Sequence, residues 1–175
     1  MQNSNDIIVR FGKMEDAEMT LEIQKSVIAE SDYLLTSPEE NKKNLLEHRE
    51  WIQKRIDNEN ETYIVAQTDE KVIGWLAFEH SSNRKRTSHT GSFGLMVHKS
   101  YRGLGVGEML LTALLHWAEE KNPSIEKVSL AVFSTNQKAI SLYKKMGFIE
   151  EGRKIKEFKI NDHEYWDDVL MYKLV

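Results

Sequence analysis

The sequence has 175 residues, 40% of them hydrophobic and 30% charged, with a formal net charge of −4 and no cysteine. This mixture is typical of one globular domain, which we expect to span residues 1–175. The absence of cysteine excludes disulfides and thiolate metal sites, and it suits a reducing, cytoplasmic location. No long apolar run or leader pattern is present, so we expect no membrane partner. The acidic balance disfavours a nucleic-acid partner.

The N-terminal part is predicted to form a strand and then two helices. Residues 6–11 favour a strand, and residues 14–31 carry apolar side chains at helical spacing. In the second helix, Ser37, Pro38 and Glu40 have the residue types of an N-cap, a first helical residue and a capping-box partner. We therefore expect this helix to begin at Pro38.

Three strands are predicted next. Residues 61–68 and 71–80 flank a short polar turn, and residues 88–97 become rich in strand formers toward their end. The basic stretch at 83–86 lies between them, in a region of serine, asparagine and threonine. We interpret it as a solvated hairpin tip rather than a binding patch.

The C-terminal part is predicted to alternate between helices and strands. A helix at 106–121 is followed by a strand at 126–133, a helix at 136–148 and two final strands. The complete order, β-α-α-β-β-β-α-β-α-β-β, indicates a mixed α/β protein. Antiparallel hairpins come first, and a crossover unit lies in the middle.

The stretch Arg102-Gly-Leu-Gly-Val-Gly107 stands where a helix is about to begin. Glycine is costly there, unless the chain must turn tightly or a ligand must approach its backbone. A glycine-rich turn before a helix N-terminus makes an anion site, and the side chain of Arg102 could add a fork to the same oxygens. A dinucleotide motif would need glycine at position 108, which is Glu108, and no P-loop lysine follows. Alone, the stretch fits a ligand-free turn equally well.

A second motif lies about thirty residues later. Its members are Asn136, Ala139 and Tyr143, followed by the pair Gly147 and Phe148. Asn136 and Tyr143 are two helical turns apart, so they share a face with Ala139 between them. Together the two motifs resemble the GNAT (Gcn5-related) N-acetyltransferase family, in particular its bacterial branch that acetylates small amines and amino acids. The resemblance implies a GNAT-like α/β fold, with a mixed, mostly antiparallel central sheet flanked by helices.

The resemblance also implies acetyl-CoA as co-substrate. The pantetheine arm would lie along the strand that ends at Val97, and main-chain amides of the glycine-rich turn would hold the pyrophosphate. The implied cofactor-binding residues are Leu95, Met96, Val97, Arg102, Gly103, Leu104, Gly105, Val106, Gly107, Glu108, Asn136, Ala139 and Tyr143.

For catalysis, the resemblance implies that Tyr143 is the general acid that protonates the departing CoA thiolate. A free phenol has a pKa of about 10, so Tyr143 is protonated at neutral pH and able to donate. The base that accepts the amine proton stays open, because Ser92 stands where an acid is expected. Glu79 is the first candidate and His89 the second. A solvated strand end and a structural histidine are the ordinary alternatives for these two residues.

The acceptor site is implied at segments 31–40 and 156–166, where Tyr33, Leu34 and Trp166 would line an apolar pocket. The expected acceptor is a primary amine of a small molecule or peptide. Two other functions stay open, namely a non-catalytic acyl-CoA-binding or sensor protein and a protein N-terminal acetyltransferase. The six histidines show no ligand spacing, so we expect no metal. A homodimer is neither required nor excluded.

Overall fold

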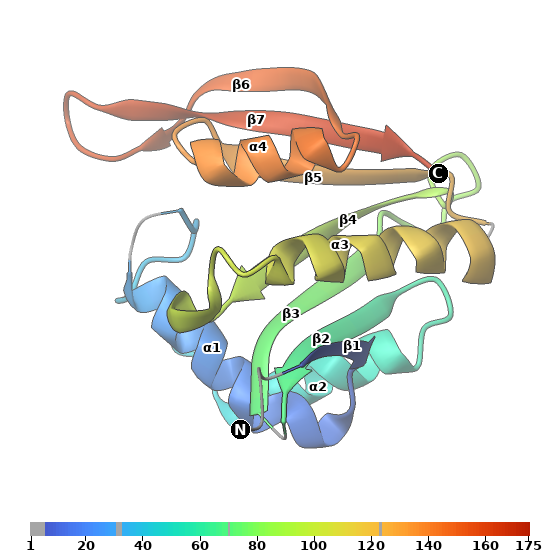
Figure 1. Cartoon of the computed structure of the whole chain (residues 1–175). Coiled ribbons are helices and arrows are strands. Elements are labelled where there is room, and N and C mark those ends of the chain that lie inside the picture. Colours follow the sequence, from blue (N-terminus) through green and yellow to red (C-terminus); the bar gives the residue numbers. More distant parts are fainter. Residues whose placement is uncertain (1–5, 31–32, 70, 123) are drawn as a thin grey trace.

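The computed structural model describes residues 6–30, 33–69, 71–122 and 124–175. Its strands and α-helices follow each other in the predicted order (Figure 1). The elements are β1 (Ile7–Phe11), α1 (Ala17–Ala29), α2 (Leu45–Ile56), β2 (Thr62–Thr68), β3 (Lys71–His80), β4 (Thr90–Val97), α3 (Val106–His116), β5 (Lys127–Phe133), α4 (Gln137–Lys145), β6 (Ile149–Lys159) and β7 (Tyr165–Leu174).

The strands form one seven-stranded sheet with the order β1-β2-β3-β4-β5-β7-β6. Every neighbouring pair is antiparallel except β4 and β5, which are parallel. The predicted mixed, mostly antiparallel sheet is therefore confirmed. Strand β7 inserts between β5 and β6, so the last strand of the chain lies next to β5.

Helices cover the two faces of the sheet unequally. On one face, α3 and α4 pack over a core that includes Leu76, Phe78 and Leu114. On the other face, α1 and α2 pack over a smaller core around Ile52 and Trp75. Helices α1 and α2 contact β2, β3 and β4. Figure 1 shows them at the opposite end of the molecule from β6 and β7.

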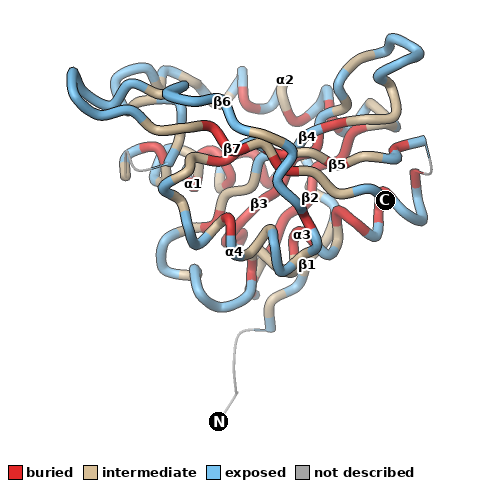
Figure 2. Tube along the Cα trace, turned by 90° about the horizontal axis from the view of Figure 1, so that it is seen from above, coloured by how far each residue is buried: buried red, intermediate tan, exposed pale blue. Residues whose placement is uncertain are grey.

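The face of α1 and α2 is left open over the middle of the sheet. Ser92 and Gly94 of β4 and Ala131 of β5 are exposed, although both strands have neighbours on each side. Figure 2 shows buried stretches on the inner strands and a mostly exposed β6 at the edge. The sheet therefore presents an uncovered area at its centre, floored by small side chains.

The second helix begins later than predicted. It starts at Leu45, where the Asn44 side chain accepts a hydrogen bond from the Glu47 amide at 2.9 Å and the Glu47 carboxylate accepts one from the Asn44 amide at 3.0 Å. Ser37 and Glu40 do make a similar contact at 2.9 Å, but only around one isolated turn. The prediction was wrong because residues 38–44 carry no apolar side chain except Pro38, so a helix there would bury nothing.

Other helix boundaries differ slightly from the prediction. The first helix opens with a 3-10 turn at Met14–Asp16, and its predicted end at Ser31 lies outside the described residues. After His116 the third helix continues as a π-helical turn, Trp117–Lys121. None of the helices in the described ranges is long and apolar enough to cross a membrane.

Candidate active site

Strands β4 and β5 separate after a short paired stretch. Their parallel register runs only from Thr90 beside Lys127 to Ser92 beside Ser129. Beyond Ser92, β4 stays paired with β3 as far as Val97, while β5 stays paired with β7. A gap therefore opens between two strands in the middle of the sheet (Figure 1).

The gap is lined on the β4 side by main-chain groups that β3 does not use. The His98 amide donates to the Ile73 carbonyl at 2.9 Å, so these two residues form a hydrogen-bonded pair. Hydrogen-bonded and non-hydrogen-bonded pairs alternate along antiparallel strands, and this pair therefore determines which residues of β4 bond to β3. By that alternation Leu95 and Val97 direct their main-chain groups toward the gap. Met96 directs its own toward Trp75 of β3, and its side chain packs against the core under α1 and α2. The Val97 carbonyl already accepts a hydrogen bond from Arg102 Nε at 3.0 Å.

The three glycines around the start of α3 have two different structural reasons. Gly103 and Gly105 have φ angles of +77° and +81°, a region that residues with a Cβ rarely adopt. Gly107 sits against α4, where a Cβ would come within 3.0 Å of Leu142 Cδ2. The turn is therefore tight, and its outer side near Gly103 and Gly105 is open space.

The same turn presents a row of free amides. Gly105 is the N-cap of α3 and has no side chain to cap it, and the first helical hydrogen bond is made by the Met109 amide. Within the described part of the chain, the amides from Gly103 to Glu108 have no hydrogen-bond acceptor. Free amides at the start of a helix, together with its dipole, form a site for an anion such as phosphate.

Two ion pairs set the charge around this turn. The Arg102 guanidinium donates to both carboxylate oxygens of Glu30, at 2.7 and 2.8 Å, and this hydrogen bonding lowers the pKa of Glu30. The predicted side-chain fork of Arg102 is thus engaged at the end of α1. The Glu108 carboxylate is held by Lys145 of α4 at 2.6 Å, which offsets its negative charge beside the free amides.

Helix α4 begins at the later motif. The Asn136 side chain caps the helix by accepting a hydrogen bond from the Ala139 amide at 3.2 Å. Ala139 is half-buried and packs against the core under α3 and α4. Asn136 therefore has a clear role in starting the helix that carries Tyr143.

Tyr143 extends from α4 toward the place where β4 and β5 separate. Its ring makes edge contacts with Phe93 of β4 and with Phe148, at centroid distances of 5.8 and 6.1 Å. Burial raises the pKa of Tyr143 to about 12. No described residue forms a hydrogen bond with its hydroxyl group. The phenol therefore stays protonated at neutral pH and has a proton to donate to a ligand in the gap.

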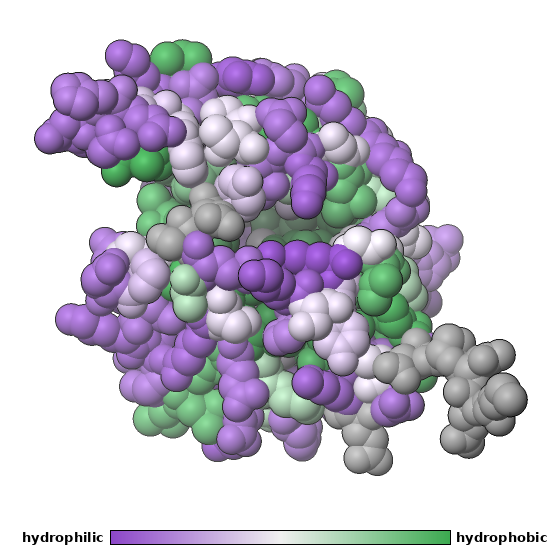
Figure 3. Space-filling view, turned by 60° about the vertical axis from the view of Figure 1, so that its left-hand side comes forward, coloured by the Kyte–Doolittle hydropathy of each residue, from purple (hydrophilic) through white to green (hydrophobic). Residues whose placement is uncertain are grey.

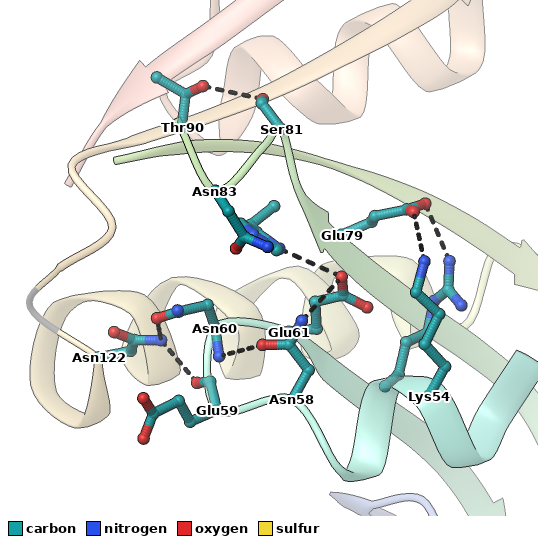
Figure 4. A network of polar contacts seen from close by, with 12 residues as sticks. Lys54, Asn58, Glu59, Asn60, Glu61, Glu79, Ser81, Asn83, Thr90 and Asn122 are labelled. Carbon is teal, nitrogen blue, oxygen red and sulfur yellow. Dashed lines mark hydrogen bonds and ion pairs between the residues drawn. The ribbon is translucent and has the colours of Figure 1, made fainter. Parts of the chain in front are cut away.

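The two candidate bases lie in different surroundings. Glu79, at the end of β3, is bound by Arg55 at 2.9 Å and by Lys54 at 3.6 Å (Figure 4). Glu79 pairs with Ser92 in the register of β3 and β4, and paired residues point to the same side of the sheet. The Glu79 side chain therefore lies on the face that α1 and α2 partly cover. His89 precedes β4 and lies beyond the paired end of β4 and β5, on the side away from the gap.

The surface of the molecule is hollowed on one side. Figure 3 shows this hollow below the β6–β7 hairpin, with apolar surface in its depth and polar surface around it. The predicted acceptor residues belong to two different parts of the chain. Tyr33 and Leu34 follow α1, where Tyr33 is exposed and Leu34 half-buried, and Trp166 belongs to β7.

Sequence reasoning missed two residues of this region. Glu30 binds Arg102 from a position 72 residues away, and no local pattern marks that pair. Asp168 is a buried carboxylate on β7, only 6% exposed. The one sequence signal for Asp168 was its place beside Asp167 and before the apolar run Val169–Met171. In the described ranges, no three metal-ligating side chains gather, and the expected absence of a metal stays a prediction.

Comparisons with known proteins agree with this architecture. Residues 28–148 match the Acetyltransferase (GNAT) family. The chain is 29% identical to the L-amino acid N-acetyltransferase AaaT of Escherichia coli K12, over 71% of this chain and 75% of that protein. It is 28% identical to the spermidine N(1)-acetyltransferase of Vibrio cholerae, over 67% of this chain and 65% of that protein.

Solved structures give the same result for the fold. An acetyltransferase of the GNAT family from Streptococcus pneumoniae superimposes with a TM-score of 0.89 at 25% identity, covering 97% of this chain and 100% of that chain. YncA, a putative acetyltransferase of Salmonella typhimurium solved with acetyl-CoA, has a TM-score of 0.85 at 18% identity, covering 96% and 93%.

Fold and comparisons together define an acyl-group transferase. The chain belongs to the GNAT family of acetyl-CoA-dependent N-acetyltransferases.

Proposed function

We propose that the protein transfers the acetyl group of acetyl-CoA directly to a primary amine of a small molecule or peptide. The observation that carries this proposal is the position of Tyr143 beside Phe93, at the point where β4 and β5 part. A pantetheine arm lying in the gap would bring the thioester to the phenol, and the main-chain groups of Leu95 and Val97 would hold the arm.

The cofactor's pyrophosphate would bind the free amides from Gly103 to Glu108. Those amides and the dipole of α3 offer positive charge without a metal or a lysine side chain. The side chain of Arg102 would act indirectly, because its pair with Glu30 ties the turn to the end of α1.

In the proposed reaction, a neutral amine attacks the thioester carbonyl carbon from the hollow. The tetrahedral intermediate then expels the thiolate of CoA, and the C–S bond breaks. Tyr143 donates its proton to the sulfur as this charge develops, and the phenol is reprotonated from solvent afterwards. No covalent acetyl-enzyme is required.

The proton of the attacking amine needs an acceptor. We propose Glu79 for this role, directly or through water, because it lies on the open face opposite the exposed Ser92. Arg55 and Lys54 hold its carboxylate at the end of β3. Figure 4 shows both contacts at the end of β3.

The names of two related enzymes indicate which amines to test first as acceptors. The Escherichia coli relative is named for L-amino acids and the Vibrio cholerae relative for spermidine. The test is to incubate the protein with acetyl-CoA and a panel of amino acids, alkylamines, polyamines and short peptides. Free thiol and N-acetylated product are then both measured.

We expect thiol and N-acetyl product to form in equal amounts with at least one class of amine. Tight binding of acetyl-CoA with no product from any amine would instead indicate an acyl-CoA sensor. Product from peptide N-termini alone would indicate a protein N-terminal acetyltransferase.

A further inference from the structure

Asp168 is a buried carboxylate on the open face of the sheet. Its register partners are Phe133 in β5 and Lys154 in β6. Phe133 lies two positions after the exposed Ala131, so Ala131, Phe133 and Asp168 share one face. That is the face without α3 and α4, where the hollow lies. Asp168 is nevertheless only 6% exposed, so its charge is largely withdrawn from water.

An aromatic cluster stands next to this carboxylate. Phe133 lies 4.1 Å from Phe158 and 5.9 Å from Trp166, measured between ring centroids. Trp166 precedes Asp168 by two residues on the same strand and therefore shares its face. A carboxylate bordered by aromatic rings is a combination that binds organic cations, because both the charge and the ring faces attract them.

The carboxylate of Asp168 is incompletely satisfied by the protein. The nearest cation, Lys154 Nζ, is 3.6 Å away, which is longer than a direct hydrogen bond of ordinary length. The same ammonium group lies 3.5 Å from Glu157, and its side chain is half exposed. Lys154 is thus shared between two acids. Burial raises the pKa of Asp168, and the charge and hydrogen bonding of Lys154 partly oppose this shift.

The neighbouring acid Asp167 is engaged differently. It accepts a hydrogen bond from the Lys156 amide at 2.8 Å and lies 3.8 Å from Arg153. Glu164 accepts a hydrogen bond from Trp166 Nε1 at 2.9 Å. Of the two acids on β7, Asp168 is therefore the one that shares a face with Phe133 and Trp166.

Building on the proposed function, we propose that Asp168, with Phe133 and Trp166, binds a second cationic group of the acceptor. The favoured acceptor is then a diamine or polyamine, with one nitrogen at the thioester and a distal ammonium group at Asp168. Asp168 lies opposite Phe133, which is four residues further along β5 than Ser129, the last residue paired with β4, and β7 lies one strand beyond β5. The acceptor must therefore be long enough to span both displacements. The distal ammonium group would displace Lys154 toward Glu157.

The first test compares acceptors on the unaltered protein. Straight-chain diamines of increasing length are paired with monoamines of the same length, and kcat and KM are measured for each. We expect diamines to be preferred in kcat/KM by about tenfold or more, since a charge-assisted contact contributes this much. The preference should grow with chain length up to one optimum, because only a diamine long enough to span the two positions can occupy both. Equal values for diamines and monoamines at every length would overturn the proposal.

The second test removes the charge. Asp168→Asn should raise KM for the best diamine by about tenfold and leave kcat and the monoamine values nearly unchanged. Asp162→Asn is the matched control, because Asp162 is an exposed acid that pairs with Lys159 at the hairpin tip. The melting temperature of each variant is recorded. Equal losses for diamine and monoamine would mean that Asp168 supports the fold rather than the acceptor.

Binding measurements separate this proposal from the proposed function. The best-matching diamine is titrated into the CoA-bound protein by calorimetry, with and without Asp168→Asn. Diamine binding that depends on Asp168 without any turnover would support this inference and contradict the proposed function. Turnover of amines that does not depend on Asp168 would support the proposed function and contradict this inference.

Discussion

The ring of Tyr143 meets the ring of Phe93 edge-on, with their centroids 5.8 Å apart. Phe93 is the first residue of β4 after the last pair with β5. This contact holds the phenol at the point where the sheet opens. It joins α4 to the strand along which the thioester arm is proposed to lie.

Removing the phenol hydroxyl should therefore slow the reaction without weakening cofactor binding. For Tyr143→Phe we expect kcat to fall by about 10²-fold, the usual size of a general-acid effect, while the Kd for acetyl-CoA changes little. Tyr165→Phe, which removes the hydroxyl of an exposed tyrosine on the same sheet, is the control. Steady-state rates and calorimetry measure the two quantities. An equal loss of affinity would make Tyr143 a binding residue instead.

Gly105 should tolerate no side chain. Its φ of +81° belongs to the left-handed region, where a Cβ costs about 1 to 2 kcal/mol. Gly105→Ala should lower the free energy of unfolding by about that amount and weaken acetyl-CoA binding, because the turn's amides would shift. Gly152→Ala is the control, since Gly152 has no positive φ and a Cβ there meets nothing within 4 Å. Unchanged affinity in Gly105→Ala would argue against the amides as the pyrophosphate site.

If Glu79 accepts the proton of the amine, the effect of removing its carboxylate should depend on pH. For Glu79→Gln we expect kcat/KM for the amine to fall by about tenfold or more at pH 7. The deficit should shrink as the pH approaches the amine's own pKa of about 10, because the amine then needs no base. Glu22→Gln, an exposed acid on α1, is the matched control. A deficit that stays constant over pH would assign Glu79 to packing with Arg55 rather than to proton transfer.

His48 should make the fold sensitive to acid. It is fully buried, its Nε2 lies 2.9 Å from Thr20 Oγ1, and burial together with the charges of Lys43 and Arg55 lowers its pKa to about 4. The unfolded chain binds the proton near pH 6.5, so the folded state loses stability as the pH falls from 6.5 toward 4. The total loss is about 3 kcal/mol.

Denaturant unfolding at pH 7 and pH 4 measures this loss. The variant His48→Gln should show a much smaller difference between the two pH values than the unaltered protein. His116→Gln, at an exposed site on α3, should show the full difference. A similar pH difference in all three proteins would mean that other groups cause the acid sensitivity.

Much of the fold could be predicted from the sequence, because the spacing of apolar residues along a segment shows which of its faces is buried. Strands β2 and β3 are covered on both faces and carry nearly continuous apolar runs, whereas α1 and α3 carry apolar stripes. The start of α2 could not be predicted correctly, because Ser37 and Asn44 both begin capping patterns. Only the second is followed by a face that packs on the sheet.

The candidate site was predictable only where it depends on local geometry. The glycine turn and the spacing from Asn136 to Tyr143 belong to single segments, so sequence reasoning located both. The contact of Arg102 with Glu30 depends on the packing of α1 against the turn. The position of Asp168 beside Phe133 depends on β7 entering the sheet between β5 and β6. Neither arrangement has a local sequence signal.

The most direct test of the account is a crystal structure of the protein with a non-hydrolysable acetyl-CoA analogue. We expect the pyrophosphate to accept hydrogen bonds from the amides between Gly103 and Glu108. The arm should lie in the gap along Leu95 and Val97, with its sulfur or sulfur substitute within about 3.5 Å of the Tyr143 hydroxyl. A cofactor bound elsewhere, or an arm that leaves Tyr143 out of reach, would contradict the account.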